Sequence, residues 1–416
     1  FCWCPEDYKI QVSFDLQGTN YPGEDYKPYS QNWGDVDKQL TREESKSFGA
    51  NLLWRNPYIE EIRELSRSGN LDFNKKVIGT FQLLKQKFSW NGEYKLYSEN
   101  LDKVLKTGTG SNADLNFIFI GMLKSFGIKA YPVVMSRRSV GMLPVSFPSL
   151  QKLNTFVVAI YDEVRGKYVY LDGSMNVSAL NVLPVELSVT KARILSADIP
   201  ENKKWVNLQE IPTNQIFMKI SANAQGNQIT GRRTTILKGY DALEYRKEYQ
   251  TKDSLVNKQE LVKEKLAISN LKRTEMEDDF VTIQEDLDFI LEAEKSEDHI
   301  YINPMLFPQL TKNPFIQSER ILPVEFPYLY RLNLSCALTL PEGYEVEELP
   351  QSQSIRSEGD GLQCKYMIQQ QGNTILLNYV FHLKGYIFLS EQYKQLQELW
   401  AKVIEKNNAL IVLKKI

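Results

Sequence analysis

The chain has 416 residues, of which 42% are apolar and 25% charged, and a formal net charge of −2. This length and composition indicate an ordinary globular protein with two or three domains. Because acidic and basic residues nearly cancel and no long basic run occurs, a surface that follows nucleic-acid phosphates is not expected. No stretch approaches the roughly 18 apolar residues of a membrane-spanning helix. The first residue is Phe1 rather than Met, which predicts a processed or truncated chain without its signal peptide.

Residues 1–40 are predicted to be the end of a preceding β domain. Residues 8–16 alternate as in a strand, and the turn residues of 20–23 follow. Since one strand cannot bury itself, its partners are expected upstream or elsewhere in the chain. A helix is then predicted over 32–40.

Residues 41–215 are predicted to form one α+β domain. Its first half is helical, with an apolar stripe over 56–67 and a second helix that Asp72 or Asn74 caps. A further short helix leads into a glycine-rich turn and an apolar helix that Gly127 ends. The second half is predicted to consist of a strand over 128–136, a loop over 137–152, and a hairpin of strands 154–161 and 167–172.

Residues 216–416 are predicted to be a β-sandwich with helical additions. A charged helical stretch is expected over 240–268, and Ser390 is expected to cap a last helix. The predicted strands are 216–220, 228–230, 280–290, 332–340, 363–369, 374–383 and 409–413.

The four cysteines and two histidines limit the metal and redox chemistry. Cys2 and Cys4 alternate on one predicted strand and point the same way, which does not suit a mutual disulfide. Cys336 and Cys364 lie on two predicted strands of one domain, where a disulfide and two buried free thiols are both open alternatives. With two histidines and no paired C-x-x-C, no zinc site is predicted, and no cofactor is expected.

The central glycine-rich turn, running into the N-terminus of a buried helix, has the layout in which a thiol enzyme presents its nucleophile. A helix N-terminus stabilises a thiolate. Here Asn112 stands where that layout needs a cysteine, and asparagine cannot attack a carbonyl. The α+β domain holds no cysteine between Cys4 and Cys336, and His299 and His382 both lie in the last domain. Cysteine–histidine catalysis therefore lacks both of its main groups.

Several motifs together resemble the transglutaminase-like superfamily. More narrowly, they resemble exported bacterial proteins, common in Bacteroidetes, that have an N-terminal β domain, a transglutaminase-like (papain-like) core and a C-terminal β domain. The likeness covers nearly the whole chain, with the first domain present only as its last strand or so. The motifs are 110–116 (GSNADLN), 127–133 (GIKAYPV), 170–173 (YLDG), 302–304 (INP), 313–315 (NPF), 320–324 (RILPV) and 340–344 (LPEGY).

The resemblance implies where a catalytic triad would lie. The cysteine position falls on Asn112, the histidine position on Thr155 (or on Asn154 in a register shifted by one), and the aspartate position on Asp172. Two of the three members are therefore replaced. Because loss of even one triad member costs several orders of magnitude in rate, the resemblance implies an inactive enzyme with a degenerate site.

Other candidate residues have a functional and a structural interpretation. Ser111 is a possible nucleophile, but without a nearby base it is better explained as a turn or cap residue. Asp172 is a possible ligand contact or a turn carboxylate. Trp90, with Tyr94 and Tyr97, suits stacking on sugar rings, although a core role for Trp90 is favoured. Arg137 suits an anion, although a solvated arginine is favoured.

A direct hydrogen bond is predicted between Asn112 and Thr155, which would keep the former site polar and packed. We expect an open surface lined by Trp90, Tyr131 and Arg137 if the site binds a ligand. A site filled by side chains is expected instead if the domain only holds its neighbours at a fixed angle.

The sequence thus predicts a catalytically inactive binding or scaffolding protein. The resemblance implies export to the periplasm or cell envelope, with a peptide, a peptidoglycan fragment or a glycan as partner. The alternative is a hydrolase or acyl-transferase that uses Ser111 or Thr155 as a non-standard nucleophile.

Overall fold

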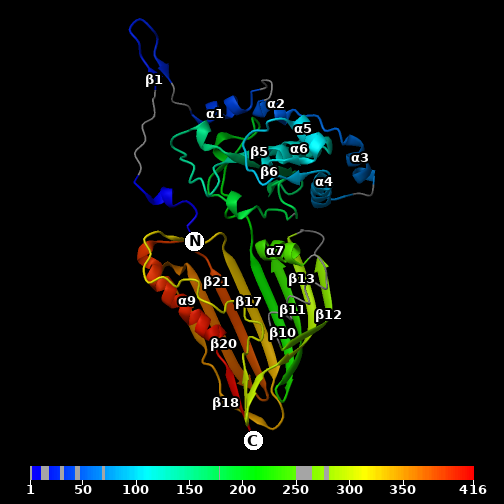
Figure 1. Ribbon diagram of the computed structural model, residues 1–416, viewed down its shortest axis with the longest axis vertical. Helices are drawn as coiled ribbons and strands as arrows, with labels where there is room; N and C mark the ends of the chain where they lie inside the picture. Colours follow the sequence, from blue (N-terminus) through cyan, green and yellow to red (C-terminus); the bar gives the residue numbers. More distant parts are fainter. Residues whose placement is uncertain are drawn as a thin grey trace. The chain divides into compact units, whose positions relative to one another are not determined.

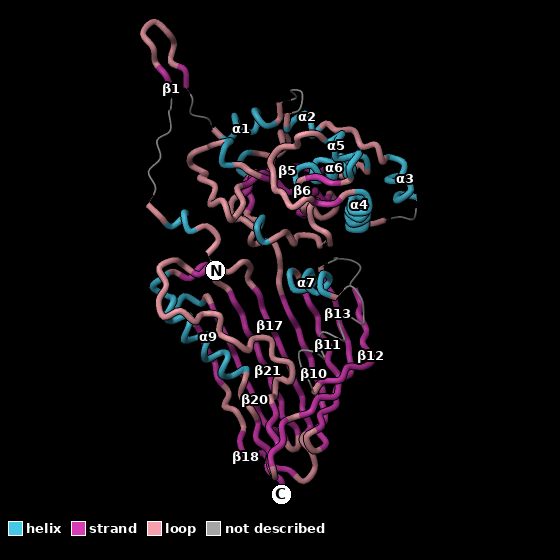
Figure 2. Tube along the Cα trace, viewed as in Figure 1, coloured by secondary structure: helices cyan, strands magenta, loops and turns pink. Residues whose placement is uncertain are grey.

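The computed structural model describes residues 2–10, 18–28, 32–42, 47–67, 71–177, 179–249, 265–275 and 281–416. The chain forms two compact units, Trp3–Pro212 and Thr213–Glu277 with Val281–Ile416, here called the N-terminal and the C-terminal unit. Helices and sheet are combined in the first unit, and strands dominate the second (Figures 1 and 2). The fold class is therefore α+β. Within the described residues, none of the helices has the length and apolar character needed to cross a membrane.

In the N-terminal unit the helices precede the main sheet along the chain (Figure 1). This sheet has the order β7-β6-β5-β8-β9 and is antiparallel throughout. The helices are α1 (Trp33–Leu40), α2 (Phe48–Leu52), α3 (Ile59–Arg67), α4 (Phe73–Lys87), α5 (Leu101–Thr107) and α6 (Asn112–Ser125). The strands are β5 (Ala130–Met135), β6 (Thr155–Asp162), β7 (Lys167–Leu171), β8 (Ala192–Ile194) and β9 (Trp205–Val206), beside the short pairs β1 (Gly18–Thr19) with β2 (Lys27–Pro28) and β3 (Ser89–Trp90) with β4 (Thr109–Gly110).

Helix α6 is the centre of the N-terminal unit, because it is buried from Asn112 to Leu123. A helix that is apolar on all sides must be enclosed by other elements, and α6 packs against α4 and β6. The approach is close at Gly121, where a Cβ atom would lie 2.5 Å from Cε3 of Trp54. The helix ends as predicted, because Gly127 follows its last turn with a φ of +77°.

Most of the predicted elements of this unit are present. Asn32 caps α1 through a capping box, and Asp72, rather than Asn74, caps α4. Strands β6 and β7 form the predicted hairpin. The strand predicted over 8–16 is not found at its start, because Tyr8 ends a 3-10 helix, Pro5–Tyr8, with proline in its first turn. Residues 11–16 of the predicted strand lie outside the described residues. The described part of 3–40 is grouped with the N-terminal unit.

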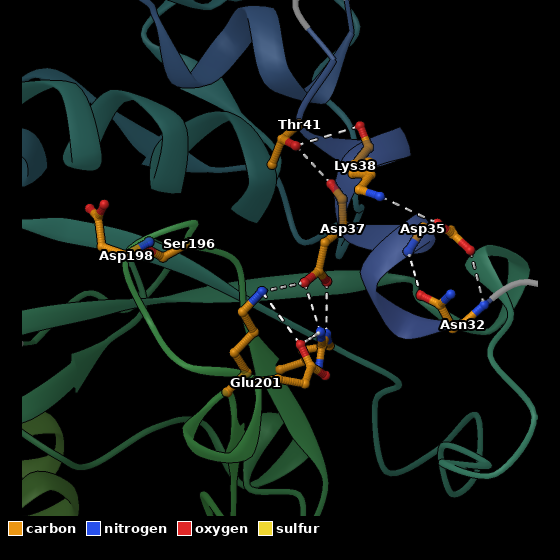
Figure 3. A network of polar contacts seen from close by, with 10 residues as sticks. Asn32, Asp35, Asp37, Lys38, Thr41, Ser196, Asp198 and Glu201 are labelled. Carbon is orange, nitrogen blue, oxygen red and sulfur yellow. Dashed lines mark hydrogen bonds and ion pairs between the residues drawn. The ribbon is translucent and has the colours of Figure 1, made fainter.

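A buried ionic network joins α1 to β8, the strand next to the edge strand β9 (Figure 3). Arg193 on β8 is fully buried and donates two hydrogen bonds of 2.7 Å to the carboxylate of Asp37 on α1. Glu201 lies 2.7 Å from the same guanidinium, and Lys204 lies 2.8 Å from Asp37. The rings of Trp33 and Trp205 flank the guanidinium carbon at 5.9 and 5.3 Å. Complete pairing is what makes such a buried charge tolerable.

The C-terminal unit is built on one eight-stranded sheet with the order β12-β13-β11-β10-β17-β21-β20-β19. All its neighbours are antiparallel except β10 and β17. Its strands are β10 (Gln215–Gln225), β11 (Gln228–Lys238), β12 (Leu266–Glu275), β13 (Thr282–Glu292), β17 (Tyr330–Thr339), β19 (Gln353–Arg356), β20 (Leu362–Gln371) and β21 (Thr374–Leu383). A four-stranded sheet joins β14 (Glu294–Ser296), β15 (His299–Ile302), β23 (Ile411–Lys415) and β18 (Tyr344–Glu348); β16 (Val324–Glu325) pairs with β22 (Ile387–Phe388).

One face of the large sheet carries the core of this unit. Burial alternates along the strands, as it does in β17 and β21, so the opposite face is the more exposed one. Helix α9 (Tyr393–Asn407) covers the buried face beside β20 and β21 (Figure 1), and Trp400 packs edge-on against Phe381 at 5.4 Å. The four-stranded sheet contributes to the same apolar cluster through Ile300 and Leu413. A helix and a small sheet therefore cover the large sheet, where the sequence predicted a β-sandwich.

Three further expectations for this unit need correction or completion. The helix predicted over 240–268 is described only as α7 (Tyr240–Glu248); residues 250–264 lie outside the described residues, and 266–268 belong to strand β12 because they pair with β13. Ser390 begins a 3-10 turn, and Gln392 precedes α9. Cys336 and Cys364 are free thiols, as are Cys2 and Cys4, so the disulfide alternative is wrong.

Candidate functional site

The glycine-rich turn places Ser111 at the N-cap of α6. Gly108 ends α5 in the left-handed conformation with a φ of +69°. The Ser111 hydroxyl donates to the Asp114 carboxylate at 2.7 Å, and the Ser111 backbone N–H donates to the same oxygen at 2.8 Å. The Asp114 N–H returns a bond to the hydroxyl, which completes a capping box. Ser111 is 2% exposed, so its hydroxyl is engaged in the cap and faces away from solvent.

Asn112 begins α6, and every polar atom of its side chain is hydrogen-bonded. Its carbonyl oxygen accepts from the Lys95 N–H at 2.7 Å. Its amide nitrogen donates to Thr155 Oγ1 at 2.6 Å and to the Phe156 carbonyl at 3.2 Å. The hydrogen bond predicted between Asn112 and Thr155 is therefore present. Both side chains are 0% exposed, so the pair forms part of the core.

Asn116 lies one helical turn after Asn112 and was not singled out in the sequence. Its amide nitrogen donates to the Phe156 carbonyl at 2.7 Å and to Asp172 Oδ1 at 2.9 Å, and its oxygen accepts from the Gly173 N–H at 2.6 Å. The two asparagines thus connect α6 to the start of β6 and the end of β7. The i, i+4 spacing of two amides on an otherwise apolar helix was the available signal.

Asp172 follows β7 and is fully buried. Burial raises the pKa of its carboxyl group to about 6, against hydrogen bonds from Ser174 and Asn116 that favour the charged form. The nearest cation is on α4, where Lys85 Nζ donates to the Gly173 carbonyl at 3.1 Å. Burial lowers the pKa of Lys85, and the charge of Asp172 opposes that shift. The Asp172 carboxylate therefore accepts one hydrogen bond from the Asn116 amide and one from the Ser174 hydroxyl, and it does not lie beside an imidazole.

The two candidate hydroxyls at this site are hydrogen-bonded within the protein, and no imidazole accompanies them among the described residues of the N-terminal unit. Thr155 accepts a hydrogen bond from Asn112, and Asn116 stands between that pair and Asp172. Ser111 has only its capping partner Asp114, and the two histidines of the chain, at 299 and 382, belong to the C-terminal unit. Among the described residues, no group of three or more His, Cys, Asp or Glu side chains could hold a metal ion.

The binding candidates separate into two places. The guanidinium carbon of Arg137 lies 5.3 Å from the ring centre of Tyr94, and the Tyr94 ring lies 4.9 Å from that of Trp90. Trp90 is half-buried and donates its indole N–H to the Glu93 carbonyl. Tyr131 is not part of this group. It lies near the other end of β5, opposite Ala159 in the register, with its ring 6.3 Å from that of Tyr168.

Arg137 is further fixed by its neighbours. Its backbone N–H donates to Asn154 Oδ1 at 3.1 Å, and its guanidinium lies 4.0 Å from Glu186. The adjacent Arg138 faces the Trp3 ring at 4.7 Å instead. The Arg137–Tyr94–Trp90 group, defined by these three residues, is half-buried and is the most accessible part of the candidate site.

Comparison with known proteins gives a partial family match and a structural neighbour. The model of a domain of unknown function with a solved structure, DUF3858, matches residues 298–413. One solved structure that matches is that of a "putative protease" from Parabacteroides distasonis, with 16% identity and a TM-score of 0.54. The match covers 91% of this chain and 58% of that one. At this identity the likeness shows a shared fold and no more. No curated protein matches the sequence.

Proposed function

We propose that this chain is a catalytically inactive protein of the transglutaminase-like type that acts as a binding or scaffolding module of the cell envelope. The observation that carries the proposal is the state of the three triad positions. Asn112, Thr155 and Asp172 hold neither a thiol nor an imidazole, and all three are 0% exposed. Asn112 is bonded directly to Thr155, and Asn116 reaches Asp172 from the same helix. The envelope location rests on the sequence resemblance alone.

The burial of Asn112, Thr155 and Asp172 supports a role for these residues in holding the domain together. A substrate needs contact with the nucleophile, whereas these three side chains are 0% exposed. A partner would instead meet the half-buried Arg137–Tyr94–Trp90 group at the surface. Tyrosine and tryptophan rings beside a guanidinium suit a peptide or glycan with an anionic or planar group.

The competing function is a hydrolase or acyl-transferase that uses Ser111 or Thr155, and an activity assay tests it directly. Fluorogenic peptide and ester substrates, and an amine-incorporation assay, are applied to the wild-type chain and to the variants Ser111→Ala and Thr155→Val. We expect no turnover above the background in any of the three proteins. Turnover by the wild type that disappears in one folded variant and persists in the other would overturn the proposal.

The binding role is tested by a thermal-shift screen with peptidoglycan fragments, short peptides and glycans. A ligand at a hundredfold excess over its dissociation constant adds about 2.7 kcal/mol of stability. We expect Arg137→Ala to abolish the shift given by a ligand of the Arg137–Tyr94–Trp90 group. Arg138→Ala is the matched control, because its guanidinium faces Trp3 instead. No shift with any class would leave the scaffolding role, and an equal loss in both variants would exclude this group as the binding site.

A further inference from the structure

The C-terminal unit contains a cavity of about 420 Å³ between helix α7 and the core face of the large sheet. Its floor comes from β10, β11 and β13, and Phe307 lines it as well. The volume is within the range of small-molecule sites in proteins. It lies wholly within one compact unit, and it is independent of the former triad positions.

Polar residues occupy this floor at positions where the alternation of the sheet calls for apolar ones. In the register of the sheet, Thr235 on β11 stands between Met218 on β10 and Glu285 on β13. Arg233 lies two residues away on the same face, and its guanidinium pairs with Glu285. All four residues are at most 6% exposed. Burying polar groups on a core face has a cost that partners must offset.

The guanidinium on the floor is already engaged. Besides the Glu285 carboxylate, Arg233 faces the Phe307 ring at 4.4 Å. The Tyr245 hydroxyl donates to the second oxygen of Glu285 at 2.7 Å. The positive charge of Arg233 is thus neutralised within the floor, and an anionic ligand would have to compete with a buried carboxylate for it.

Helix α7 presents one acidic and aromatic face to the cavity. Asp241, Glu244, Tyr245 and Glu248 recur at the three- and four-residue spacing of one helix face, and all four line the cavity. With Glu285, the described lining holds four carboxylates and one guanidinium. Arg233 pairs with Glu285, and Glu244 pairs with Lys247 at 2.7 Å; within the described lining, Asp241 is the carboxylate with a buried oxygen that has no hydrogen-bond partner.

Two lining groups have an unmet hydrogen-bonding capacity. Thr235 is 5% exposed, and its hydroxyl has no hydrogen-bond partner. Oδ2 of Asp241 is buried and also lacks one. Burial, followed by repulsion from Glu244, raises the pKa of Asp241 to about 6, the direction expected of a carboxylate that lacks a cation. Buried polar atoms are nearly always paired. The Asp241 carboxylate can only accept, so it calls for a hydrogen-bond donor, and the Thr235 hydroxyl can accept from the same donor group.

We propose that this cavity binds a primary ammonium group carried on an apolar body, with Asp241 as its counter-ion. An ammonium group has three N–H donors and no acceptor, which suits the carboxylate of Asp241 and the hydroxyl of Thr235. The apolar body would contact Met218, Leu237 and Phe307, which line the same cavity. The group can come from a free amine, from a lysine side chain or from the N-terminus of a peptide.

The test uses the full chain and three probes of similar shape: 2-phenylethylamine, 2-phenylethanol and 3-phenylpropionate. Affinities are measured by calorimetry at pH 7.5, and the site is mapped by crystal soaking. A charge-assisted hydrogen bond contributes about 1.5–3 kcal/mol, so we expect the amine to bind at least about tenfold more tightly than the alcohol. The anion is expected to bind more weakly than either.

The matched variants are Asp241→Asn, Thr235→Val and Asp288→Asn. Asp241→Asn keeps the shape and removes the charge, so we expect it to erase the preference for the amine; Thr235→Val is expected to weaken amine binding. Asp288 lies on β13 outside the cavity lining and bonds Asn270, so its variant is the control. Melting temperatures show that each variant is folded.

Equal binding of amine and alcohol, an unchanged preference in folded Asp241→Asn, or no binding to the folded wild type would each overturn the proposal. A second set of probes distinguishes the sources of the ammonium group. Phenylalanine amide presents a peptide N-terminus, and Nα-acetyl-lysine amide presents a side-chain ammonium. The source whose binding depends on Asp241 is the one that the cavity recognises.

Discussion

Replacing Arg193 by methionine tests whether the buried ionic network stabilises the N-terminal unit. The guanidinium is fully buried, makes two 2.7 Å bonds to Asp37 and lies 2.7 Å from Glu201. Methionine has a similar length but no charge, so Asp37 would keep only Lys204, at 2.8 Å. Breaking a buried pair from one side costs about 3–5 kcal/mol. Because Lys204 still neutralises Asp37, we expect the lower end, about 3 kcal/mol.

Urea unfolding followed by tryptophan fluorescence measures the change in the stability of the N-terminal unit. Of the six tryptophans, only Trp400 lies in the C-terminal unit, so the signal reports mainly on the N-terminal one. We expect the midpoint of this transition to fall while its slope stays constant.

A double variant separates the loss of the pair from the general effect of substitution. Asp37→Leu combined with Arg193→Met removes both charges, and buried pairs replaced by apolar residues are often neutral in stability. We therefore expect the double variant to be more stable than either single one, with a coupling energy above about 1 kcal/mol. A cost below about 1 kcal/mol for Arg193→Met, or strictly additive single effects, would refute the reasoning.

Two further predictions concern Asn112 and Asp172. Asn112→Ala leaves the Lys95 N–H without its acceptor and Thr155 without its donor, so we expect a loss of about 2–3 kcal/mol in urea unfolding; Asn91→Ala, on an exposed turn, is expected to cost below about 1 kcal/mol. The folded-state pKa of Asp172, about 6, exceeds its ordinary 3.8, so its contribution to stability is present below pH 4 and is lost as the pH rises through 6. The unfolding free energy of the wild type, relative to Asp172→Asn, should therefore fall by about 2.4 kcal/mol between pH 4 and 7, and a constant difference would contradict this pKa.

The sequence was informative where local chemistry decides the structure. The cap at Asn32, the stop at Gly127 and the hairpin of β6 and β7 follow from side chains within a few residues of one another. The sequence was misleading where contacts between residues far apart in the chain decide the structure. The helix predicted over 240–268 was extended too far, because the apolar residues 266–268 pair with β13 as part of the edge strand β12.

The candidate site shows the same division. The hydrogen bond between Asn112 and Thr155 was predictable because the sequence resemblance assigned both residues to one site. Asn116 was missed, although its i, i+4 spacing from Asn112 marks a polar position on the same helix face, because nothing near it in the sequence indicates its partner 56 residues later. Tyr131 was expected to line the same surface as Arg137, but it lies near the start of β5 and Arg137 follows its end, and a strand rises about 3.3 Å per residue.

Chemistry and burial at Asn112, Thr155 and Asp172 both explain how these polar side chains are accommodated in the core. All three are 0% exposed, and a buried polar group is tolerated only when it is hydrogen-bonded. Asn112 bonds Thr155 and accepts from the Lys95 N–H, and Asn116 bonds Asp172 from the next turn of the helix. These side chains therefore form a hydrogen-bonded joint between helix α6 and the strands β6 and β7, and the proposed binding or scaffolding function rests on that joint.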